Sequence, residues 1–178
     1  MKNIVVISST PRNNGNSDIL ASEFVRGAKD SNNNVTKIDL RKMNYGFCRG
    51  CMYCASHNVC AIKDDVANVL DVVQNADVVV FATPIYYYEM CGQLKTFIDR
   101  LNPLYRRENK FTDVYAIMAS ADTDLKSMDK CVGGIQGWID CYDGVSLKGE
   151  IRAVGLEGIG EATDSKYMAM AYEMGKNA

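Results

Sequence analysis

The stretch that decides the fold is residues 4–17, I-V-V-I-S-S-T-P-R-N-N-G-N-S. It opens with four β-branched apolar residues, which is the pattern of a strand buried on both faces of a parallel sheet. A polar loop follows, and the spacing of Ile19, Leu20 and Phe24 then predicts the inner side of a helix that begins at about Ser17. This order of strand, loop and helix predicts an α/β protein with a ligand-binding loop directly after its first strand.

The same alternation continues along the chain. Further strands are predicted at residues 35–40, 77–83, 114–119 and 145–154, and further helices follow residue 64 and lie around residues 94–101, 131–142 and 167–174. Five such units predict a doubly wound, five-stranded parallel sheet with helices on both faces, a three-layer α/β/α domain over residues 1–178. Right-handed crossovers place the loops after the first four strands at one sheet edge, where open α/β sheets bind ligands.

Length and composition exclude several classes of protein. A chain of 178 residues suits one domain, and its formal net charge of −2 gives no general attraction to nucleic acid. No apolar run approaches the ~20 residues that span a bilayer, and the N-terminal strand lacks the features of a signal peptide. We therefore expect a cytoplasmic protein that binds neither nucleic acid nor membrane.

The loop after the first strand has the composition of a phosphate-binding cradle. A helix N-terminus offers unpaired N–H groups and a partial positive charge to an anion. Hydroxyl and amide side chains add donors, an arginine neutralises charge, and a glycine allows close approach of the backbone. The candidate phosphate ligands are Ser9, Thr10, Arg12, Gly15, Asn16 and Ser17. A solvated turn with Ser17 as the helix cap is the alternative.

Other known uses of such a loop lack their residues here. Gly15 is the only glycine in the loop, which excludes the G-x-G-x-x-G pattern of dinucleotide folds, and the G-K-[ST] of a P-loop is absent. The first cysteine, Cys48, comes too late to be a phosphatase nucleophile in this loop, and no aspartates of a receiver domain follow the first and third strands. A monophosphate held by hydroxyls and backbone amides remains.

The loop after the third strand is rich in aromatic residues. Residues 83–100 read T-P-I-Y-Y-Y-E-M-C-G-Q-L-K-T-F-I-D-R. Alternate residues of an extended segment face opposite ways, so Tyr86, Tyr87 and Tyr88 cannot all pack on the core. At least one of them faces the ligand edge or a partner subunit. Aromatic faces and nearby backbone amides suit a planar heterocycle, whereas packing or a subunit interface is the alternative for each ring.

Both segments resemble those of one known family. Residues 8–17 are similar to the S-P-R-x-x-G-N-[ST] phosphate loop of the NADPH-dependent FMN reductases, and residues 83–100 are similar to their P-[IV]-Y…Q-L-K-x-F-I-D-R flavin segment. The resemblance covers Lys2 to about Ser120. It implies a flavodoxin-like fold, FMN as cofactor, NAD(P)H as co-substrate, and an oxidoreductase that reduces flavin, a quinone or a similar small-molecule acceptor.

The resemblance also assigns site residues. The phosphate would lie on the candidate ligands named above, and the isoalloxazine ring would lie against Thr83, Pro84, Ile85, Tyr86 and Tyr87. Topology alone places three residues after the fourth strand at the ribityl or ring side, namely Ser120, Ala121 and Asp122. The family has one aromatic residue where this chain has three tyrosines, so which ring meets the flavin stays open. No protein acid or base is assigned as catalytic, because the flavin carries the chemistry.

Four of the seven cysteines crowd into one segment. Cys48, Cys51, Cys54 and Cys60 form C-x2-C-x2-C-x5-C in the loop after the second strand. An odd cysteine count and a reducing cytosol argue against a complete disulfide framework. Four thiolates ligate a [4Fe–4S] cluster, and two-residue spacings let one loop wrap it. Zinc and free thiols are the alternatives.

The histidine and the three remaining cysteines are not expected to bind a metal or take part in redox chemistry. The only histidine, His57, is predicted to be a solvated loop residue within the cysteine segment. The three remaining cysteines lie in or beside predicted helices and are expected to be small apolar fillers. They are Cys91, Cys131 and Cys141.

The cysteine spacing resembles the compact motif of the iron–sulfur flavoproteins, a branch of the same family, and Lys63, Asp64 and Asp65 match its sequel. This resemblance implies an alternative function, in which a cluster passes single electrons between the flavin and an external donor such as ferredoxin. In that branch the exchange crosses a subunit contact, which implies a homodimer or homotetramer. A third alternative is a cysteine-rich redox- or metal-sensing module without turnover.

Overall fold

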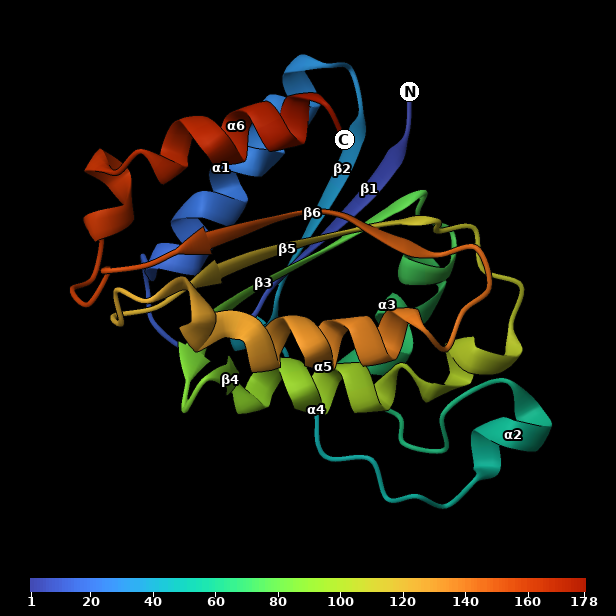
Figure 1. Cartoon of the computed structure of the whole chain (residues 1–178). Coiled ribbons are helices and arrows are strands. Elements are labelled where there is room, and N and C mark those ends of the chain that lie inside the picture. The colour runs from blue at the N-terminus through green and yellow to red at the C-terminus, as the bar shows by residue number, and fades with distance from the viewer.

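The computed structural model describes residues 1–178, and its strands and helices alternate along the chain (Figure 1). The strands are β1 (Asn3–Ser8), β2 (Asn34–Asp39), β3 (Val78–Tyr86), β4 (Glu89–Met90), β5 (Asp113–Ala119) and β6 (Ser146–Ala153). The α-helices are α1 (Asn16–Asp30), α2 (Tyr53–His57), α3 (Asp65–Gln74), α4 (Gly92–Arg100), α5 (Asp129–Ile139) and α6 (Tyr167–Lys176). Short 3-10 turns are η1 (Leu40–Lys42), η2 (Asn102–Arg106), η3 (Leu125–Met128) and η4 (Glu161–Asp164).

The sheet is doubly wound, as the sequence predicts. Its strand order is β2-β1-β3-β5-β6, and every neighbouring pair on this path is parallel. The chain moves to one side of β1 for β2 and to the other side for β3, so the carboxyl ends of β1 and β3 form the topological switch point. The short strand β4, which pairs antiparallel with the end of β3, is an addition that the sequence analysis did not predict.

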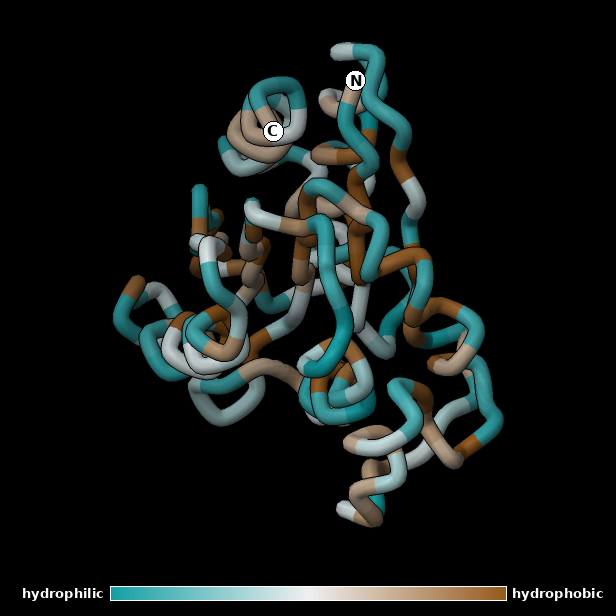
Figure 2. Tube along the Cα trace, turned by 90° about the vertical axis from the view of Figure 1, so that its right-hand side faces the viewer, coloured by the Kyte–Doolittle hydropathy of each residue, from teal (hydrophilic) through white to brown (hydrophobic).

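Helices cover both faces of this sheet (Figure 1). Helices α1 and α6 lie on one face, and α3, α4 and α5 lie on the other. Alternate strand residues supply the two cores: Val79 and Phe81 face α3–α5, whereas Val78 and Val80 face α1 and α6. Apolar residues therefore run along the central strands, and hydrophilic residues gather on turns and outer helix sides (Figure 2).

Local signals set the helix starts. The Asp64 carboxylate accepts a hydrogen bond from the Val66 amide at 3.2 Å, so Asp64 caps α3. Helix α1 has Gly15 at its N-cap, which places Ser17 inside the first turn and not at the cap.

Helix α5 forms despite its three glycines because it buries Ile135 and Trp138 against the sheet.

Strand β3 continues beyond its predicted end at Thr83, through Pro84 to Tyr86, and turns back into β4. The two residues of this tight turn are Tyr87 and Tyr88, with φ of 51° and 67°. Two successive positive φ values favour Asn-Gly in such hairpins, and bulky side chains are rare there. Tyr86, Tyr87 and Tyr88 are all exposed, and 98% of the surface of Tyr87 is accessible to solvent.

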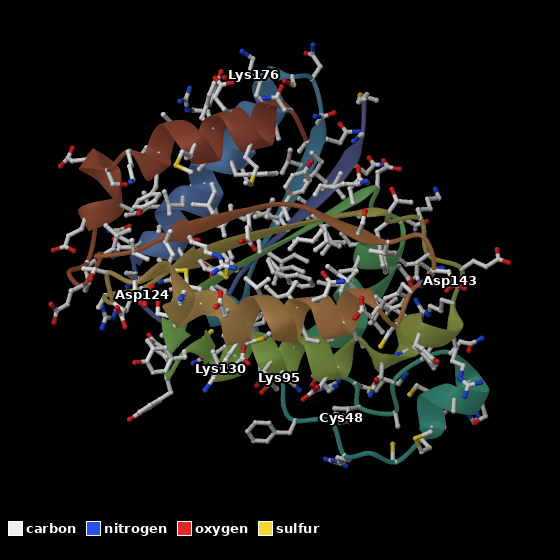
Figure 3. All side chains as sticks on the ribbon, in the orientation of Figure 1. Cys48, Lys95, Asp124, Lys130, Asp143 and Lys176 are labelled. Carbon is white, nitrogen blue, oxygen red and sulfur yellow. The ribbon has the colours of Figure 1, made fainter.

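The cysteine segment, residues 43–64, leaves the carboxyl end of β2 and runs past α4, where α2 stands apart from the sheet (Figure 1). Cys48 lies on this segment beyond α4, away from the sheet (Figure 3). No residue between 46 and 65 belongs to either buried apolar cluster. None of the helices has the length and apolarity that crossing a membrane requires.

Candidate functional site

A cavity of about 280 Å³ lies at the carboxyl edge of the sheet, where the loops after β1, β5 and β6 meet the end of β3. It brings together residues from both segments that the sequence analysis singled out. Its lining consists of Thr10, Arg12, Gly15, Asn16, Ser17, Pro84, Ile85, Tyr86, Ala119, Ala121, Leu156 and Glu157. The loop after β1 and the end of β3, whose residues Pro84, Ile85 and Tyr86 are called the platform below, thus form parts of one site.

The first turn of α1 presents donors that have no acceptor in the chain. The hydroxyl of Ser17 is buried without a hydrogen-bond partner, and the N–H groups of Asn16 and Ser17 donate to no group of the protein. A Cβ placed on Gly15 would lie 2.3 Å from Thr10 Oγ1, so a larger residue would disturb this turn. Unpaired buried donors at the positive end of a helix form a site for an anion.

The charged side chains around this turn leave the Arg12 guanidinium available to a ligand. Its Nη1 donates only to the carbonyl of Glu157, at 3.3 Å, and the side chain is exposed at the cavity. The acidic residue of the turn, Asp18, is held by Lys37 and by the Ser8 hydroxyl, both at 2.6 Å. Burial opposes ionisation of Asp18, but the bonds from Lys37 and Ser8 outweigh it and lower its pKa. The carboxylate is therefore already paired.

Two predicted phosphate ligands have other partners. The Ser9 hydroxyl donates to the Ala82 carbonyl at 2.8 Å, under the loop, and Ser9 is absent from the lining of this cavity. The Asn16 amide donates to the carbonyls of Leu156 and Gly158, and its oxygen accepts from the Ala162 amide. Asn16 thus fixes the loop after β6, and the side chains of Ser9 and Asn16 bond the protein here. That these two residues hold a phosphate stays a prediction.

The ring side of the site follows the prediction in part. Pro84, Ile85, Tyr86 and Ala121 line the main cavity. A smaller neighbouring cavity of about 140 Å³ is lined by Ile85, Tyr87, Tyr88, Ser120, Asp122 and Ser127. Both cavities share Ile85, so the residues after β5 lie beside the platform.

Thr83 is the exception on this side. It is fully buried, and its hydroxyl accepts from the Cys91 amide at 3.1 Å and donates to the Pro84 carbonyl at 2.9 Å. It fixes the exit of β3 and does not line the cavity. Leu156 and Glu157, which do line it, were missed because they follow the fifth parallel strand, whose loop carried no motif.

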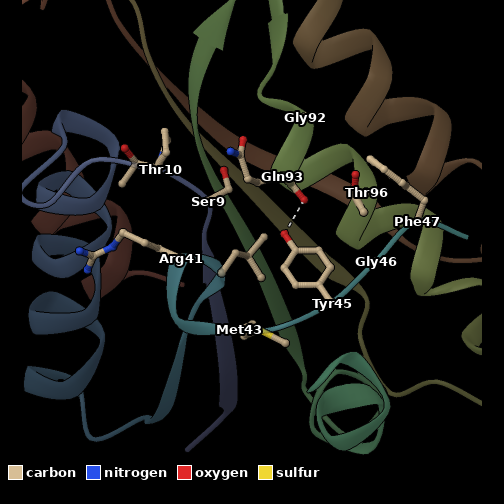
Figure 4. A pocket seen from close by; sticks show the side chains of 12 residues that line it. Ser9, Thr10, Arg41, Met43, Tyr45, Gly46, Phe47, Gly92, Gln93 and Thr96 are labelled. Carbon is tan, nitrogen blue, oxygen red and sulfur yellow. Dashed lines mark hydrogen bonds between the residues drawn. The ribbon is translucent and has the colours of Figure 1, made fainter. Parts of the chain in front are cut away.

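A second cavity of about 520 Å³ lies on the other side of the loop after β1 (Figure 4). It opens between that loop, the start of the cysteine segment and the first turns of α4, and it shares Thr10 with the first cavity. Tyr45 donates from Oη to the Gln93 carbonyl at 2.9 Å across it. Burial, with a smaller effect of Cys91, raises the pKa of Tyr45 to about 12, so this phenol stays protonated. The sequence analysis did not predict this cavity.

All four cysteines of the cysteine segment line one small cavity, together with Arg100 and Asn102 at the end of α4. Their thiols form no disulfide, and burial, with smaller contributions from the other three cysteines, raises the pKa of Cys54. No three side chains meet at one point to hold a single metal ion. A [4Fe–4S] cluster needs a different arrangement, one thiolate for each iron around a shared space, and this donor set fits that chemistry.

Backbone and side-chain N–H groups point at two of these sulfurs. Cys48 Sγ accepts from the Gly50 amide at 3.5 Å and from Asn102 Nδ2 at 3.7 Å, and Cys60 Sγ accepts from the Ile62 amide at 3.4 Å. Hydrogen bonds to ligand sulfurs are among the features that set cluster potentials.

The predictions for the other three cysteines and for the histidine are confirmed in part. Cys91 and Cys131 are buried, as expected of apolar fillers, but Cys141 is exposed at the end of α5, and the prediction is wrong there. The residue does not fill the core because it lies just past the last buried turn of the helix. His57 is exposed and stacks on Tyr53, with ring centroids 3.8 Å apart, so it is a solvated residue as predicted.

Helix α4 runs from the 520 Å³ cavity to the cysteine cavity. Its first residues lie beside the loop after β1, whereas Asp99 and Arg100 at its end line the cysteine cavity. Nine helical residues at 1.5 Å each correspond to roughly 13 Å. Within one chain, none of these cysteines lines the 280 Å³ cavity at the sheet edge.

The strand order, the anion-binding turn after β1 and the platform at the end of β3 define a flavodoxin-like α/β protein. Solved structures with this fold include an NAD(P)H:quinone oxidoreductase from Methanothermobacter marburgensis, with a TM-score of 0.77, 17% identity, and coverage of 99% of this chain and 95% of that one. An azoreductase from Bacillus anthracis has a TM-score of 0.73 at 16% identity, with both chains covered completely. At these identities the likeness concerns the fold alone.

Sequence comparison gives the family. Residues 2–136 match the model of the NADPH-dependent FMN reductases, and the chain belongs to that family. An iron–sulfur flavoprotein from Archaeoglobus fulgidus is 31% identical over 107 residues, which are 60% of this chain and 48% of that protein. Another from Methanocaldococcus jannaschii is 30% identical over 120 residues, 66% of this chain and 62% of that protein. The matches thus span about half to three fifths of these relatives.

Proposed function

We propose that this protein is an FMN-dependent oxidoreductase that takes electrons from NAD(P)H and binds FMN in the 280 Å³ cavity. The observation that carries the proposal is the buried Ser17 hydroxyl, which has no partner and lies at the start of α1 beside two free amides. The FMN phosphate supplies the acceptors that this turn lacks. When bound, FMN supplies hydride and single-electron chemistry.

The protein residues bind and orient the cofactor. Thr10 and Ser17 donate to the phosphate, and Arg12 neutralises part of its charge. Pro84, Ile85 and Tyr86 support the ring, and residues 120–122 border its far side. No acid or base of the protein is required in this scheme, because the flavin carries the chemistry.

Removal of the phosphate donors tests the FMN site. Arg12→Ala combined with Ser17→Ala should weaken FMN binding by roughly 3–6 kcal/mol, because each lost charge-assisted bond contributes about 1.5–3 kcal/mol. Arg26→Ala combined with Ser22→Ala is the matched control, since it removes the same residue types from α1 outside the cavity. Flavin fluorescence titration measures both. Equal affinities of the two double variants would refute the phosphate assignment.

Electron donation is tested separately. NADPH or NADH mixed rapidly with the FMN-loaded protein without oxygen should bleach the visible flavin absorption in a single fast phase. The family description supports a nicotinamide donor. A small-molecule acceptor such as a quinone or free flavin should then restore the colour. Flavin that binds but is reduced by neither nucleotide would leave the FMN site intact and remove NAD(P)H from the proposal.

A second candidate function rests on the cysteine cavity. Four free thiols surround one space, and N–H groups already donate to Cys48 and Cys60, so we propose a [4Fe–4S] cluster there that exchanges single electrons with an external protein such as ferredoxin. Iron and acid-labile sulfide measured after anaerobic purification test this. Cys51→Ser should abolish both, whereas Cys141→Ser, which changes an exposed cysteine elsewhere, should not. Protein free of iron and sulfide would refute the cluster.

Oligomerisation is part of the same proposal. Within one chain the four cysteines line neither of the two cavities at the sheet edge, whereas exposed tyrosines border both. We propose a homodimer or homotetramer in which a partner subunit covers these tyrosines and brings its cysteine segment close. Light scattering gives the mass directly, and a monomer at working concentrations would argue against it.

A further inference from the structure

Arg100, the last residue of α4, is a buried charged residue with 1% of its surface exposed. Its guanidinium forms a two-pronged ion pair with Asp64: Nη1 donates to Oδ2 at 2.6 Å and Nη2 donates to Oδ1 at 2.8 Å. Nη1 also donates to the carbonyl of Gly46 at 2.8 Å. Arg100 therefore joins α4 to both ends of the cysteine segment.

The guanidinium also reaches a sulfur. Arg100 Nη2 lies 3.5 Å from Cys60 Sγ, and Arg100 is the only charged side chain that donates to a cysteine of this segment. Its Nε is buried without a partner, although the residue lines the cavity of the four cysteines. One donor of this buried cation is thus unpaired within the chain.

A cation at this place acts on redox chemistry. Reduction of a thiolate-bound cluster adds one negative charge, so a guanidinium bonded to a ligand sulfur stabilises the reduced form more than the oxidised form. Asp64 opposes this effect because it partly neutralises the same guanidinium. Removal of the Arg100 charge should therefore lower the reduction potential of the cluster, and removal of the Asp64 charge should raise it.

We infer that Arg100 is a positioning residue that raises the reduction potential of the metal cluster held by the cysteine segment, and that Asp64 limits this rise. The inference rests on the proposed [4Fe–4S] site. It adds a specific role for two residues outside the cysteine motif, carried by the contact between Nη2 and Cys60 and by the unpartnered Nε.

Three variants of the anaerobically purified, FMN-loaded protein test it. Arg100→Gln combined with Asp64→Asn removes both charges and keeps two amides that can bond each other, so no buried charge is left alone. We expect a tenfold less favourable reduction, which for one electron is about 59 mV lower in midpoint potential. Asp64→Asn alone should raise the potential. Arg100→Lys keeps the positive charge but loses the two-pronged guanidinium, so its midpoint potential should lie between those of the double variant and the wild type.

Arg107 provides the matched control. Its Nε donates to the Asn58 carbonyl at 2.7 Å, so it also anchors the cysteine segment, but it donates to no sulfur. Arg107→Gln should leave the potential unchanged. An equal shift in this variant would mean that loop anchoring alone is responsible, which overturns the inference.

Iron, sulfide and FMN contents are measured before each redox titration by electron paramagnetic resonance. An iron-loaded double variant with the wild-type potential overturns the role of Arg100 and leaves the cluster in place. A wild-type protein without iron overturns the cluster and, with it, this inference. Where the double variant fails to fold, Asp64→Asn and Arg100→Lys decide: opposite shifts support the inference, and unchanged potentials in both overturn it.

Discussion

Asn16 and Ser17 are adjacent in the first turn of α1, but their side chains have different partners. The Asn16 amide forms three hydrogen bonds to residues 156–162, whereas the Ser17 hydroxyl has none. Asn16→Ala should therefore lower the stability of the FMN-free protein by about 1–3 kcal/mol, and Ser17→Ala should not lower it. Ser17→Ala should instead weaken FMN binding about tenfold or more. Urea unfolding and flavin titration separate the two effects, and reversed results would contradict the assigned roles.

The second prediction at this scale concerns acid. Burial raises the pKa of Asp18, but its bonds to Lys37 and Ser8 lower it by more, so the folded pKa lies below the ordinary value of 3.8. The stabilisation from this carboxylate is therefore present above pH 3.8 and is lost as pH falls through the folded pKa. Asp18→Asn should cost about 1–2 kcal/mol at neutral pH and nothing in strong acid. Unfolding measured at several pH values checks this, and a difference that persists in strong acid would contradict it.

Single residues also mark the limit of sequence prediction. Gly15, Arg12 and Ser17 line the cavity, as the position of their loop after the first strand leads one to expect, and that they hold a phosphate stays a prediction. Ser9, Asn16 and Thr83 were assigned to the ligand although their side chains bond the protein. The type of a residue determines which hydrogen bonds its side chain can form. Its partner, such as Leu156 for Asn16, depends on tertiary contacts across 140 residues.

At the scale of elements, the hairpin between β3 and β4 stands out. Tyr87 and Tyr88 hold positive φ angles that bulky residues adopt at a cost of roughly 1 kcal/mol or more each. Tyr87→Asn combined with Tyr88→Gly supplies the residues that this turn type favours, so the FMN-free protein should become more stable by about 1–2 kcal/mol. Thermal unfolding measures the gain.

The same variant should lose function if the strained tyrosines serve the site. We expect slower flavin reduction or loss of the oligomer, since the two rings line the cavity beside the platform. Tyr105→Asn, which changes an exposed tyrosine elsewhere, is the control. A more stable variant with unchanged turnover and mass would mean that the two rings serve neither purpose.

Elements were predicted well where periodicity was strong. The five parallel strands follow from runs of apolar residues along the chain. Strand β4 was not predicted, because two residues carry no period and a Tyr-Tyr turn contradicts turn preferences. The 520 Å³ cavity was also missed, because it depends on how Tyr45 in an irregular segment meets α4.

The whole molecule should report cofactor binding through its stability. A ligand at 100 times its Kd adds about 2.7 kcal/mol to the folded state. For a chain of 178 residues this corresponds to a rise in Tm of roughly 5–11 °C with FMN. Riboflavin, which has the same ring without phosphate, should give a much smaller rise at equal concentration. Scanning calorimetry with both compounds checks this, and equal shifts would contradict phosphate binding at α1.

The cysteine segment is attached to the molecule in an unusual way. Residues 46–65 add nothing to either buried cluster, and Arg100 and Arg107 fasten them to the body. Such an appendage can lengthen, shrink or change its ligands over evolution without disturbing the inherited flavin scaffold. A lineage that dropped these cysteines would keep the cavity at the sheet edge, because none of them lines it, and one that kept them would keep the ligands of the proposed cluster.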